Sequence, residues 1–137
     1  MSLERFVAAQ DEGGTYDRAL RELRSGRKTS HWMWFVLPQV AGLGRSSTAV
    51  HYALAGLAEA RDYLAHPVLG VRLRECAQAL LDLPGSDPEA VLGGIDAQKL
   101  RSSMTLFAAA DPDEPAFPAV LDKYFAGRRD PATLDRV

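Results

Sequence analysis

The apolar residues of this chain recur at helical spacing over short stretches, and glycine or proline ends most of these stretches. The clearest apolar stripe consists of Leu69, Leu73, Cys76 and Leu80, at steps of four, three and four. This spacing places the side chains on one face of a helix, which is then buried against other helices. Because no stretch continues over many heptads, the pattern predicts a compact multihelical domain and not a long coiled coil.

The amino-acid composition favours helices over strands. Alanine and leucine together account for 39 residues, while isoleucine and valine account for 10. Alanine and leucine are strong helix formers, whereas β-branched residues favour strands. The chain also contains no internal repeat and no long linker. We therefore predict one all-α domain over residues 1–137, built from about seven or eight short helices.

Several residues with short polar side chains mark expected helix starts. They are Thr15, Ser30, Asp87, Asp96 and Asp130. The side-chain oxygens of such residues accept hydrogen bonds from the first free backbone N–H groups of a helix. Asp87 and Asp130 are each followed by proline, which suits the first helical position. We therefore expect each of the five residues to cap a helix.

Charge and hydropathy exclude several classes of protein. The chain has 16 basic and 18 acidic residues, a formal net charge of -2, and no long block of either sign. A dedicated nucleic-acid binder usually has a basic surplus, so we expect no nucleic-acid partner. The longest strictly apolar run, 32–37, is far shorter than the roughly 20 residues of a membrane span. With no secretory signal at its start, the chain is expected to be cytoplasmic and without a membrane partner.

The sequence offers no metal or cofactor motif. Cys76 is the only cysteine and lies on the apolar stripe, so we expect its thiol to be inert. His31, His51 and His66 lack the spacing of metal ligands. There is no Walker loop and no dinucleotide-binding fingerprint, and the Gly42–Leu43–Gly44 segment is too short to specify phosphate binding. We therefore expect no metal and no cofactor.

The most unusual segment is KTSHWMWF, which starts at Lys28 and contains both tryptophans. Positions two apart on a helix are separated by about 200°, so Trp32 and Trp34 cannot share a face. We expect one of them in the core and the other beside a groove or an interface. Ser30 and His31 precede the expected helix, whose N-terminus favours anions. The segment is either an anion site with an aromatic wall or a buried aromatic hub beside a solvated lysine.

A second segment, HPVLGVRLRE, ends at Glu75. Arg72 and Glu75 are three residues apart and are therefore neighbours on one helix face. Gly70 inside this helix costs about 1 kcal/mol relative to alanine, which indicates close approach by a ligand or by another helix. We favour helix packing at Gly70 and a turn at His66.

A third segment, KLRSSMTLF, begins at Lys99. Hydroxyl residues at Ser102, Ser103 and Thr105 are poor choices for a helix interior because they compete for backbone hydrogen bonds. Lys99 and Ser103 are four residues apart and share a face. A lysine beside hydroxyls can orient an anionic or sugar ligand, and a desolvated lysine can act as a base or nucleophile. Alternatively, the hydroxyls bond to carbonyls of their own helix.

A last distinctive segment, LDKYFAGRRDPATL, covers residues 121–134. It resembles a bacterial family named domain of unknown function 1810, and other parts of the chain carry the same resemblance. They are KTSHWMWFVLPQ (28–39), the glycines at 42 and 44, HPVLGVRLRE (66–75) and KLRSSMTLF (99–107). The segment 91–96 departs from the family pattern, which tends to have a bulky aromatic residue and a proline there. The resemblance implies a multihelical fold and no established activity. Some members are labelled calpastatin, a name for which these residues give no support.

A more distant similarity links the chain to YbiA-like helical proteins, which are associated with ADP-ribose and riboflavin-pathway chemistry. That similarity implies a site for a phosphorylated ribosyl ligand and cleavage of an N-glycosidic bond. Such cleavage requires a carboxylate or lysine near the anomeric carbon and an aromatic wall for the base. Residues of these types are Lys28, Trp34, Glu75 and Lys99.

We therefore expect the protein to bind or hydrolyse a small phosphorylated ribosyl ligand, similar to a nucleotide or to ADP-ribose. The expected ligand-binding residues are Lys28, Ser30, His31, Trp34, Arg72, Lys99, Ser102 and Ser103. The candidate catalytic residues are Glu75 and Lys99, and we expect Lys28, Ser30, His31 and Trp34 to meet Lys99 and Ser103 in one concave site. The alternative is a non-catalytic interaction module or structural homodimer, because interfaces are rich in tryptophan and arginine and the chain has 13 arginines. The protein is accordingly expected to be a monomer or a homodimer.

Overall fold

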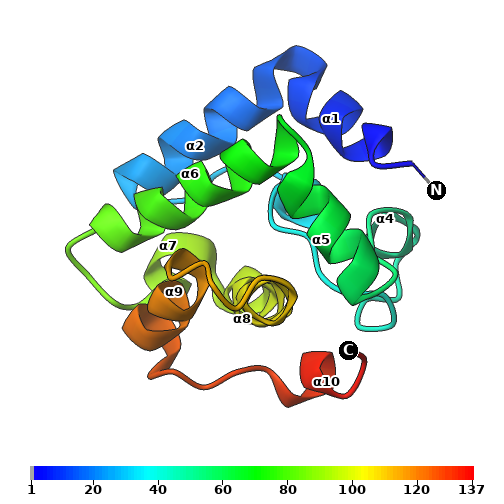
Figure 1. Ribbon diagram of the computed structural model, residues 1–137. Helices are drawn as coiled ribbons and strands as arrows, with labels where there is room; N and C mark the ends of the chain where they lie inside the picture. Colours follow the sequence, from blue (N-terminus) through cyan, green and yellow to red (C-terminus); the bar gives the residue numbers. More distant parts are fainter. Residues whose placement is uncertain (1) are drawn as a thin grey trace.

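The computed structural model describes residues 2–137, and its regular elements are helices (Figure 1). They are α1 (Glu4–Asp11), the 3-10 turn η1 (Glu12–Gly14), α2 (Thr15–Ser25), α3 (Met33–Val36), α4 (Ser47–His51), α5 (Leu57–Ala65), α6 (Leu69–Asp82), α7 (Pro88–Leu92), α8 (Gly94–Ala110), α9 (Ala116–Phe125) and α10 (Pro131–Leu134). One isolated β-bridge joins Val40 to Leu54. The expected all-α class is confirmed. Single-turn elements such as α3 and α10 make the helices more numerous than seven or eight.

Helix α8 lies at the centre of the fold. It contacts α5, α7, α9 and α10, and Figure 1 shows it almost end-on, with the other helices around it. Its residues 102–108 are all buried. Because this part of the helix has no solvent-facing side, its hydroxyl groups have to find hydrogen-bond partners inside the protein.

Helices α2 and α6 pack side by side at one edge of this arrangement (Figure 1). The predicted stripe on α6 is confirmed, because its four residues are all buried in the core. Gly70 marks the contact between α6 and the end of α5. A Cβ atom at Gly70 would lie 2.0 Å from the carbonyl oxygen of Leu64. The close approach at Gly70 is therefore one of helix against helix, as we expected.

Two of the predicted helix caps are confirmed. The Asp87 carboxylate accepts hydrogen bonds from the backbone N–H groups of Glu89 and Ala90 at the start of α7. The Asp130 carboxylate accepts one from the backbone N–H of Thr133 in α10. In both helices proline occupies the first turn, as the sequence predicted.

Three of the predicted caps are wrong. Thr15 is the first residue of α2, and Asp96 lies in the first turn of α8. The capping positions belong to Gly14 and Gly93, whose φ angles of 69° and 82° turn the chain directly into the helices. Glycine adopts this left-handed conformation without steric cost, so the chain reaches each helix without a side-chain cap. Ser30 lies ahead of α3, and its side chain is bound elsewhere.

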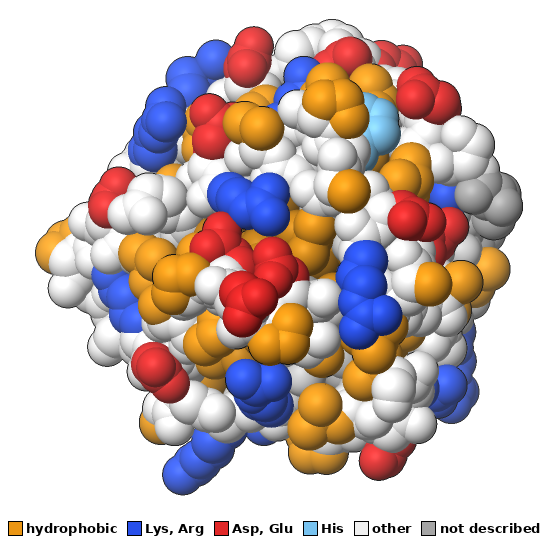
Figure 2. Space-filling view, viewed as in Figure 1, with side chains coloured by type: hydrophobic (Ala, Val, Ile, Leu, Met, Phe, Trp, Pro, Cys, Tyr) orange, Lys and Arg blue, Asp and Glu red, His pale blue; other side chains and the backbone are white. Residues whose placement is uncertain are grey.

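The surface mixes charges of both signs. On the face of residues 2–137 drawn in Figure 2, basic and acidic side chains are interspersed with apolar ones, without an extended basic patch. None of the helices in this part of the chain combines the length and the apolar character needed to cross a membrane. That the protein has no nucleic-acid partner stays a prediction.

Candidate functional site

One buried carboxylate holds the segment that precedes α3. Glu22 of α2 accepts hydrogen bonds from the backbone N–H groups of Thr29 (2.8 Å) and Ser30 (3.0 Å). It also accepts from the Ser30 hydroxyl (2.6 Å) and from the indole N–H of Trp32 (2.9 Å). Burial alone would raise the pKa of Glu22, but these hydrogen bonds lower it to about 2. Glu22 is therefore ionised at neutral pH and fixes the chain from Thr29 to Trp32.

One tryptophan lies in the core and the other beside a pocket, as we predicted. Trp32 is fully buried, and its ring lies beneath the ammonium group of Lys28, 5.1 Å from the ring centroid. Trp34 is only partly buried and lines a surface pocket. The Lys99 ammonium group lies 5.0 Å from the centroid of the Trp34 ring. The aromatic segment 32–34 thus connects the core to the pocket.

This pocket, which we call the lysine pocket, has a volume of about 400 Å³. It lies between the segment before α3 and the start of α8. Its lining residues are Lys28, His31, Met33, Trp34, Leu92, Gly93, Gly94, Ile95, Asp96 and Lys99. The structure therefore brings together four residues from two separate segments that we expected to meet: Lys28, His31, Trp34 and Lys99.

Asp96 lies between the two lysines of the pocket. One carboxylate oxygen of Asp96 is 2.9 Å from the Lys28 ammonium nitrogen, and the other is 3.8 Å from that of Lys99. The Lys28 side chain is only 8% exposed, whereas that of Lys99 is 22% exposed. The Lys28 ammonium is thus buried and paired. Lys99 is held loosely, and two lysines against one carboxylate leave one positive charge in the pocket.

The start of α8 adds backbone donors to this pocket. Gly93 occupies the capping position, and no side chain of the described residues caps the helix. The first N–H groups of a helix have no partner within the helix, and they carry the positive end of its dipole. In α8 these groups belong to Gly94, Ile95 and Asp96, which all line the lysine pocket. An anion bound beside Lys99 therefore meets donors from the backbone as well as the ammonium group.

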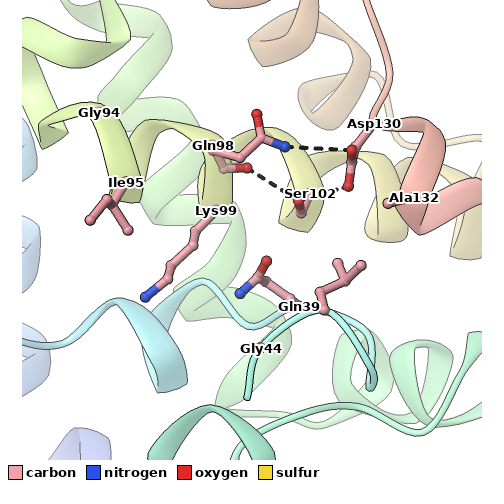
Figure 3. A pocket seen from close by; sticks show the side chains of 10 residues that line it. Gln39, Gly44, Gly94, Ile95, Gln98, Lys99, Ser102, Asp130 and Ala132 are labelled. Carbon is pink, nitrogen blue, oxygen red and sulfur yellow. Dashed lines mark hydrogen bonds between the residues drawn. The ribbon is translucent and has the colours of Figure 1, made fainter. Parts of the chain in front are cut away.

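A second pocket, which we call the glutamine pocket, adjoins the first and has a volume of about 510 Å³. It lies between α8, α10 and the loop 39–44 (Figure 3). Its lining residues are Gln39, Leu43, Gly44, Gly94, Ile95, Gln98, Lys99, Ser102, Asp130 and Ala132. Gly94, Ile95 and Lys99 line both pockets, so the first two turns of α8 form the wall that the pockets share.

Asp130 is a structural residue of the glutamine pocket. Its carboxylate accepts hydrogen bonds from the hydroxyls of Ser102 (2.8 Å) and Thr133 (2.6 Å), and from the Gln98 side chain (3.4 Å). Burial opposes ionisation, but the bonds from Thr133 and Ser102 lower the pKa of Asp130 below its ordinary value. The carboxylate is thus fully used in attaching α10 to α8.

The hydroxyls of α8 have different surroundings. Ser102 lines the glutamine pocket, but it donates to Asp130 and also lies 3.2 Å from the Gln98 carbonyl. Thr105 bonds to the Arg101 carbonyl of its own helix. Ser103 is fully buried, lines neither pocket, and its hydroxyl has no partner in the described structure. The expected convergence of Ser103 with Lys99 is therefore wrong, because Ser103 faces the core.

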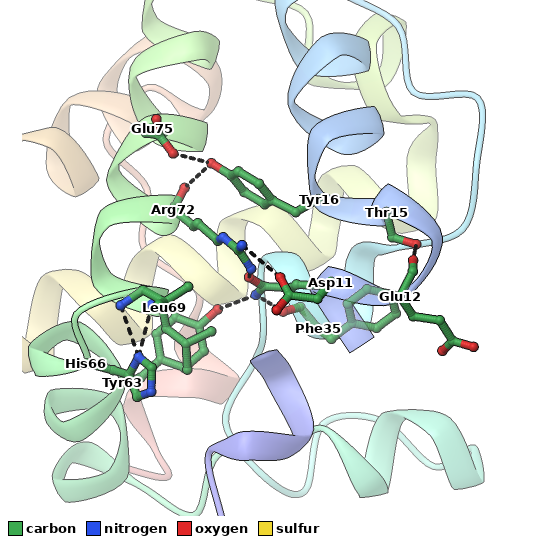
Figure 4. A network of polar contacts seen from close by, with 12 residues as sticks. Asp11, Glu12, Thr15, Tyr16, Phe35, Tyr63, His66, Leu69, Arg72 and Glu75 are labelled. Carbon is green, nitrogen blue, oxygen red and sulfur yellow. Dashed lines mark hydrogen bonds and ion pairs between the residues drawn. The ribbon is translucent and has the colours of Figure 1, made fainter. Parts of the chain in front are cut away.

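Arg72 and Glu75 lie on α6, in a polar network outside both pockets (Figure 4). Arg72 pairs with Asp11 (2.8 Å), and Glu75 accepts a hydrogen bond from the Tyr16 hydroxyl (2.7 Å). Burial is the main cause that raises the pKa of Cys76 in this network to about 12, so its thiol is protonated, as expected of an inert residue. Arg72, expected to bind the ligand, and Glu75, a candidate catalytic residue, therefore line neither the lysine pocket nor the glutamine pocket. Their partners are helices α1 and α2.

Reasoning from sequence missed three residues of the site. Asp96, interpreted as a helix cap, is the carboxylate between the lysines. Gln39 closes the segment KTSHWMWFVLPQ but was given no role, and Ile95 was not singled out although it is 78% exposed on the wall shared by the pockets. The one available signal was the departure of the segment 91–96 from the family pattern. This segment supplies Leu92 to Asp96 of the lysine pocket.

The whole chain matches a known family model and a solved structure. Over residues 1–137 it matches the model described as Protein of unknown function (DUF1810). It is 47% identical in sequence to the conserved hypothetical protein Rv1873 from Mycobacterium tuberculosis, whose crystal structure it matches with a TM-score of 0.93. The match covers 97% of this chain and 94% of that chain. No curated protein matches this chain.

Proposed function

The chain belongs to the DUF1810 family of proteins of unknown function, and from the geometry of its own site we propose that it binds a small phosphorylated ribosyl ligand. One observation carries the proposal. Lys28, His31 and Trp34 meet Lys99 in one open pocket, although 65 or more residues separate Lys99 from each of them in the sequence. Such a pocket, with a few convergent polar groups, is typical of a small-molecule site.

The charge of the lysine pocket suits a phosphate. Asp96 balances one of the two lysines, and the residues that carry the free backbone N–H groups of α8 line the same pocket. Lysine binds phosphate as a point charge, and the start of a helix adds backbone hydrogen bonds to the same anion. Lys28 holds Asp96 in place, while Lys99 is the cation that the ligand contacts. The phosphate then competes with Asp96 only at the weak 3.8 Å pair.

A hydrolytic activity is a second candidate function, and Asp96 is the observation that favours it. Cleavage at an anomeric carbon uses a carboxylate or a lysine near that carbon. Glu75 lies outside the pocket, so within it this role falls to Asp96 together with Lys99. An interaction module, the rival expectation, needs a tryptophan in an interface. Trp32 is buried and Trp34 faces the lysine pocket, which favours a ligand over a partner protein.

Calorimetric titration with ribose 5-phosphate and with unphosphorylated ribose tests the proposed function. We expect ribose 5-phosphate to bind and ribose to bind at least tenfold more weakly, because the phosphate contacts supply most of the affinity. Lys99→Ala should abolish the difference in affinity between ribose 5-phosphate and ribose, while leaving the circular dichroism spectrum unchanged. Arg21→Ala removes a positive charge from an exposed position of α2 that lines neither pocket, and it should bind like the parent. Equal affinity for the two sugars in the parent protein would refute the proposed function.

The same titration, followed by chromatography of the ligand, tests hydrolysis with an N-ribosyl phosphate such as nicotinamide mononucleotide. Release of the free base by the parent and its loss in Asp96→Asn, with binding retained, would support a catalytic role for Asp96. Light scattering of Trp34→Ala tests the rival function. A change of oligomeric state in this variant would favour an interface at Trp34.

A further inference from the structure

We propose that the glutamine pocket is a subsite for a nucleobase, so that the ligand is a nucleoside phosphate and not a free sugar phosphate. The inference rests on the proposed function, because it takes the lysine pocket as the phosphate site. The base would lie between α8, α10 and the loop 39–44. The ribose would lie over Ile95 and Lys99, on the part of α8 that lines both pockets. Four features of the described residues support this arrangement.

The first feature is that the Lys99 ammonium group already occupies one face of the Trp34 ring in the lysine pocket. The Lys99 ammonium group lies 5.0 Å from the centroid of the Trp34 ring and 3.8 Å from Asp96. The cation is attracted to the face of the aromatic ring, which positions it for a phosphate. A base stacked on this face would displace the cation that binds the phosphate. A base that leaves Lys99 in this position can lie in the adjoining pocket, which shares Lys99 with the first.

The second feature is the apolar wall of the glutamine pocket. Leu43, Ile95 and Ala132 line it, together with the glycines Gly44 and Gly94. Ile95 is 78% exposed, the largest exposed fraction among the large apolar side chains of residues 2–137. A flat, uncharged ring placed against Ile95 would remove apolar surface from water, and this removal is favourable in proportion to the area buried.

The third feature is an unpaired carboxamide. The backbone of Gln39 is fixed, because its carbonyl accepts a hydrogen bond of 3.0 Å from the backbone N–H of Leu54. Its side chain extends into the glutamine pocket (Figure 3), and within residues 2–137 it makes no hydrogen bond. A carboxamide presents one acceptor and two donor hydrogens side by side. This arrangement complements the edge of a base, as in the bidentate contact of glutamine with adenine.

The fourth feature is the charge of the glutamine pocket. Among its described lining residues, Lys99 is the one cation, and it lies at the boundary with the lysine pocket. Asp130 is the one anion, and four hydrogen bonds already occupy its carboxylate. The glutamine pocket thus has no cation apart from the Lys99 that it shares with the lysine pocket. An uncharged group suits it better, which favours a nucleoside monophosphate over a sugar bisphosphate.

Calorimetric titration with ribose 5-phosphate, adenosine 5′-monophosphate and adenosine tests the inference. In the parent protein we expect the monophosphate to bind about tenfold more tightly than ribose 5-phosphate, the lower end of what a bidentate base contact contributes. Ala132→Leu fills the glutamine pocket from an exposed position of α10, and Gln39→Leu removes the carboxamide at similar volume. In both variants the dissociation constant of the monophosphate should lie within about twofold of that of ribose 5-phosphate. The affinity for ribose 5-phosphate itself should equal that of the parent. Ala58→Leu, at an exposed position of α5 outside both pockets, should behave like the parent.

The outcomes separate this inference from the proposed function. If the parent binds both phosphates equally and neither variant changes this, the base subsite is refuted while the phosphate site stands. If adenosine binds as tightly as the monophosphate and both variants weaken it, the base subsite stands and the phosphate site is refuted. If no ligand binds, both are refuted. Circular dichroism and melting temperatures of the variants establish that each is folded, and either pocket variant alone is sufficient for the comparison.

Discussion

The Glu22 carboxylate accepts the indole N–H of Trp32 at 2.9 Å, and this one contact joins helix α2 to the aromatic segment behind the lysine pocket. Three further donors from Thr29 and Ser30 converge on the same carboxylate. The position of Lys28, His31 and Trp34 at the pocket therefore depends on a residue that contacts no ligand.

Replacing Glu22 by glutamine should lower the free energy of unfolding by about 2–4 kcal/mol. The carboxamide keeps one acceptor oxygen, so donors such as the Trp32 indole are left unpaired in a buried site. Urea denaturation measures the loss. Glu12→Gln, at an exposed position of η1, should change stability by less than about 0.5 kcal/mol. Equal stability of the two variants would mean that the Glu22 contacts contribute nothing to folding.

Stability should fall as the pH is lowered from about 4.5 to about 2. The pKa of Glu22 is about 2 in the folded protein and 4.5 for an unperturbed group, so the unfolded chain takes up its proton first. Glu22 therefore stabilises the fold fully above pH 4.5, by about 3 kcal/mol, and this contribution disappears as pH falls through the folded value. Asp130, whose pKa is also lowered, acts in the same direction. Chemical denaturation over this pH range measures how the free energy of unfolding changes with pH. This dependence should be weaker in Glu22→Gln, and an unchanged dependence would contradict the lowered pKa of Glu22.

Ser102→Ala and Ser103→Ala should have opposite effects on stability. Ser102→Ala removes a hydrogen bond to the ionised Asp130 and should cost about 1–3 kcal/mol. Ser103→Ala removes a buried hydroxyl that has no partner in the described structure, so it should be neutral or stabilising. Thermal denaturation compares the two directly. Destabilisation by Ser103→Ala similar to that of Ser102→Ala would indicate that an ordered water or a ligand satisfies the Ser103 hydroxyl.

Lys28→Ala and Lys99→Ala should separate folding from binding. Lys28 is almost buried and pairs with Asp96 at 2.9 Å, so its loss leaves Asp96 with only the longer pair to Lys99 and should cost about 1–3 kcal/mol. Lys99 pairs at 3.8 Å in a more exposed position, and Lys99→Ala should cost less than about 1 kcal/mol. Melting temperatures test both expectations. A larger loss of stability from Lys99→Ala than from Lys28→Ala would reverse the roles that we assign to the two lysines.

Local sequence patterns were sufficient for most of the fold. The stripe on α6 and the proline-initiated caps at Asp87 and Asp130 depend on residues within a few turns of one another. Periodicity and capping act over these short distances, so they can be predicted from the chain alone. The predicted caps that were wrong share a cause. Glycines ahead of α2 and α8, and the carboxylate of Glu22 at Ser30, supplied alternatives that short-range rules do not weigh.

Local sequence patterns do not predict which side chains meet in the site. The chemistry of Lys28, Trp34 and Lys99 was visible in the sequence, and the structure brings these residues together; their role in binding stays a prediction. Glu75 carries equally suitable chemistry, yet it faces α2, while Asp96 takes the place between the lysines. Which side chains meet across the chain depends on how helices rotate and pack against each other, and this is set by the burial of all apolar faces at once. The residue types and helices are therefore encoded locally, whereas the composition of the two pockets emerges only when α8 is enclosed by its neighbours.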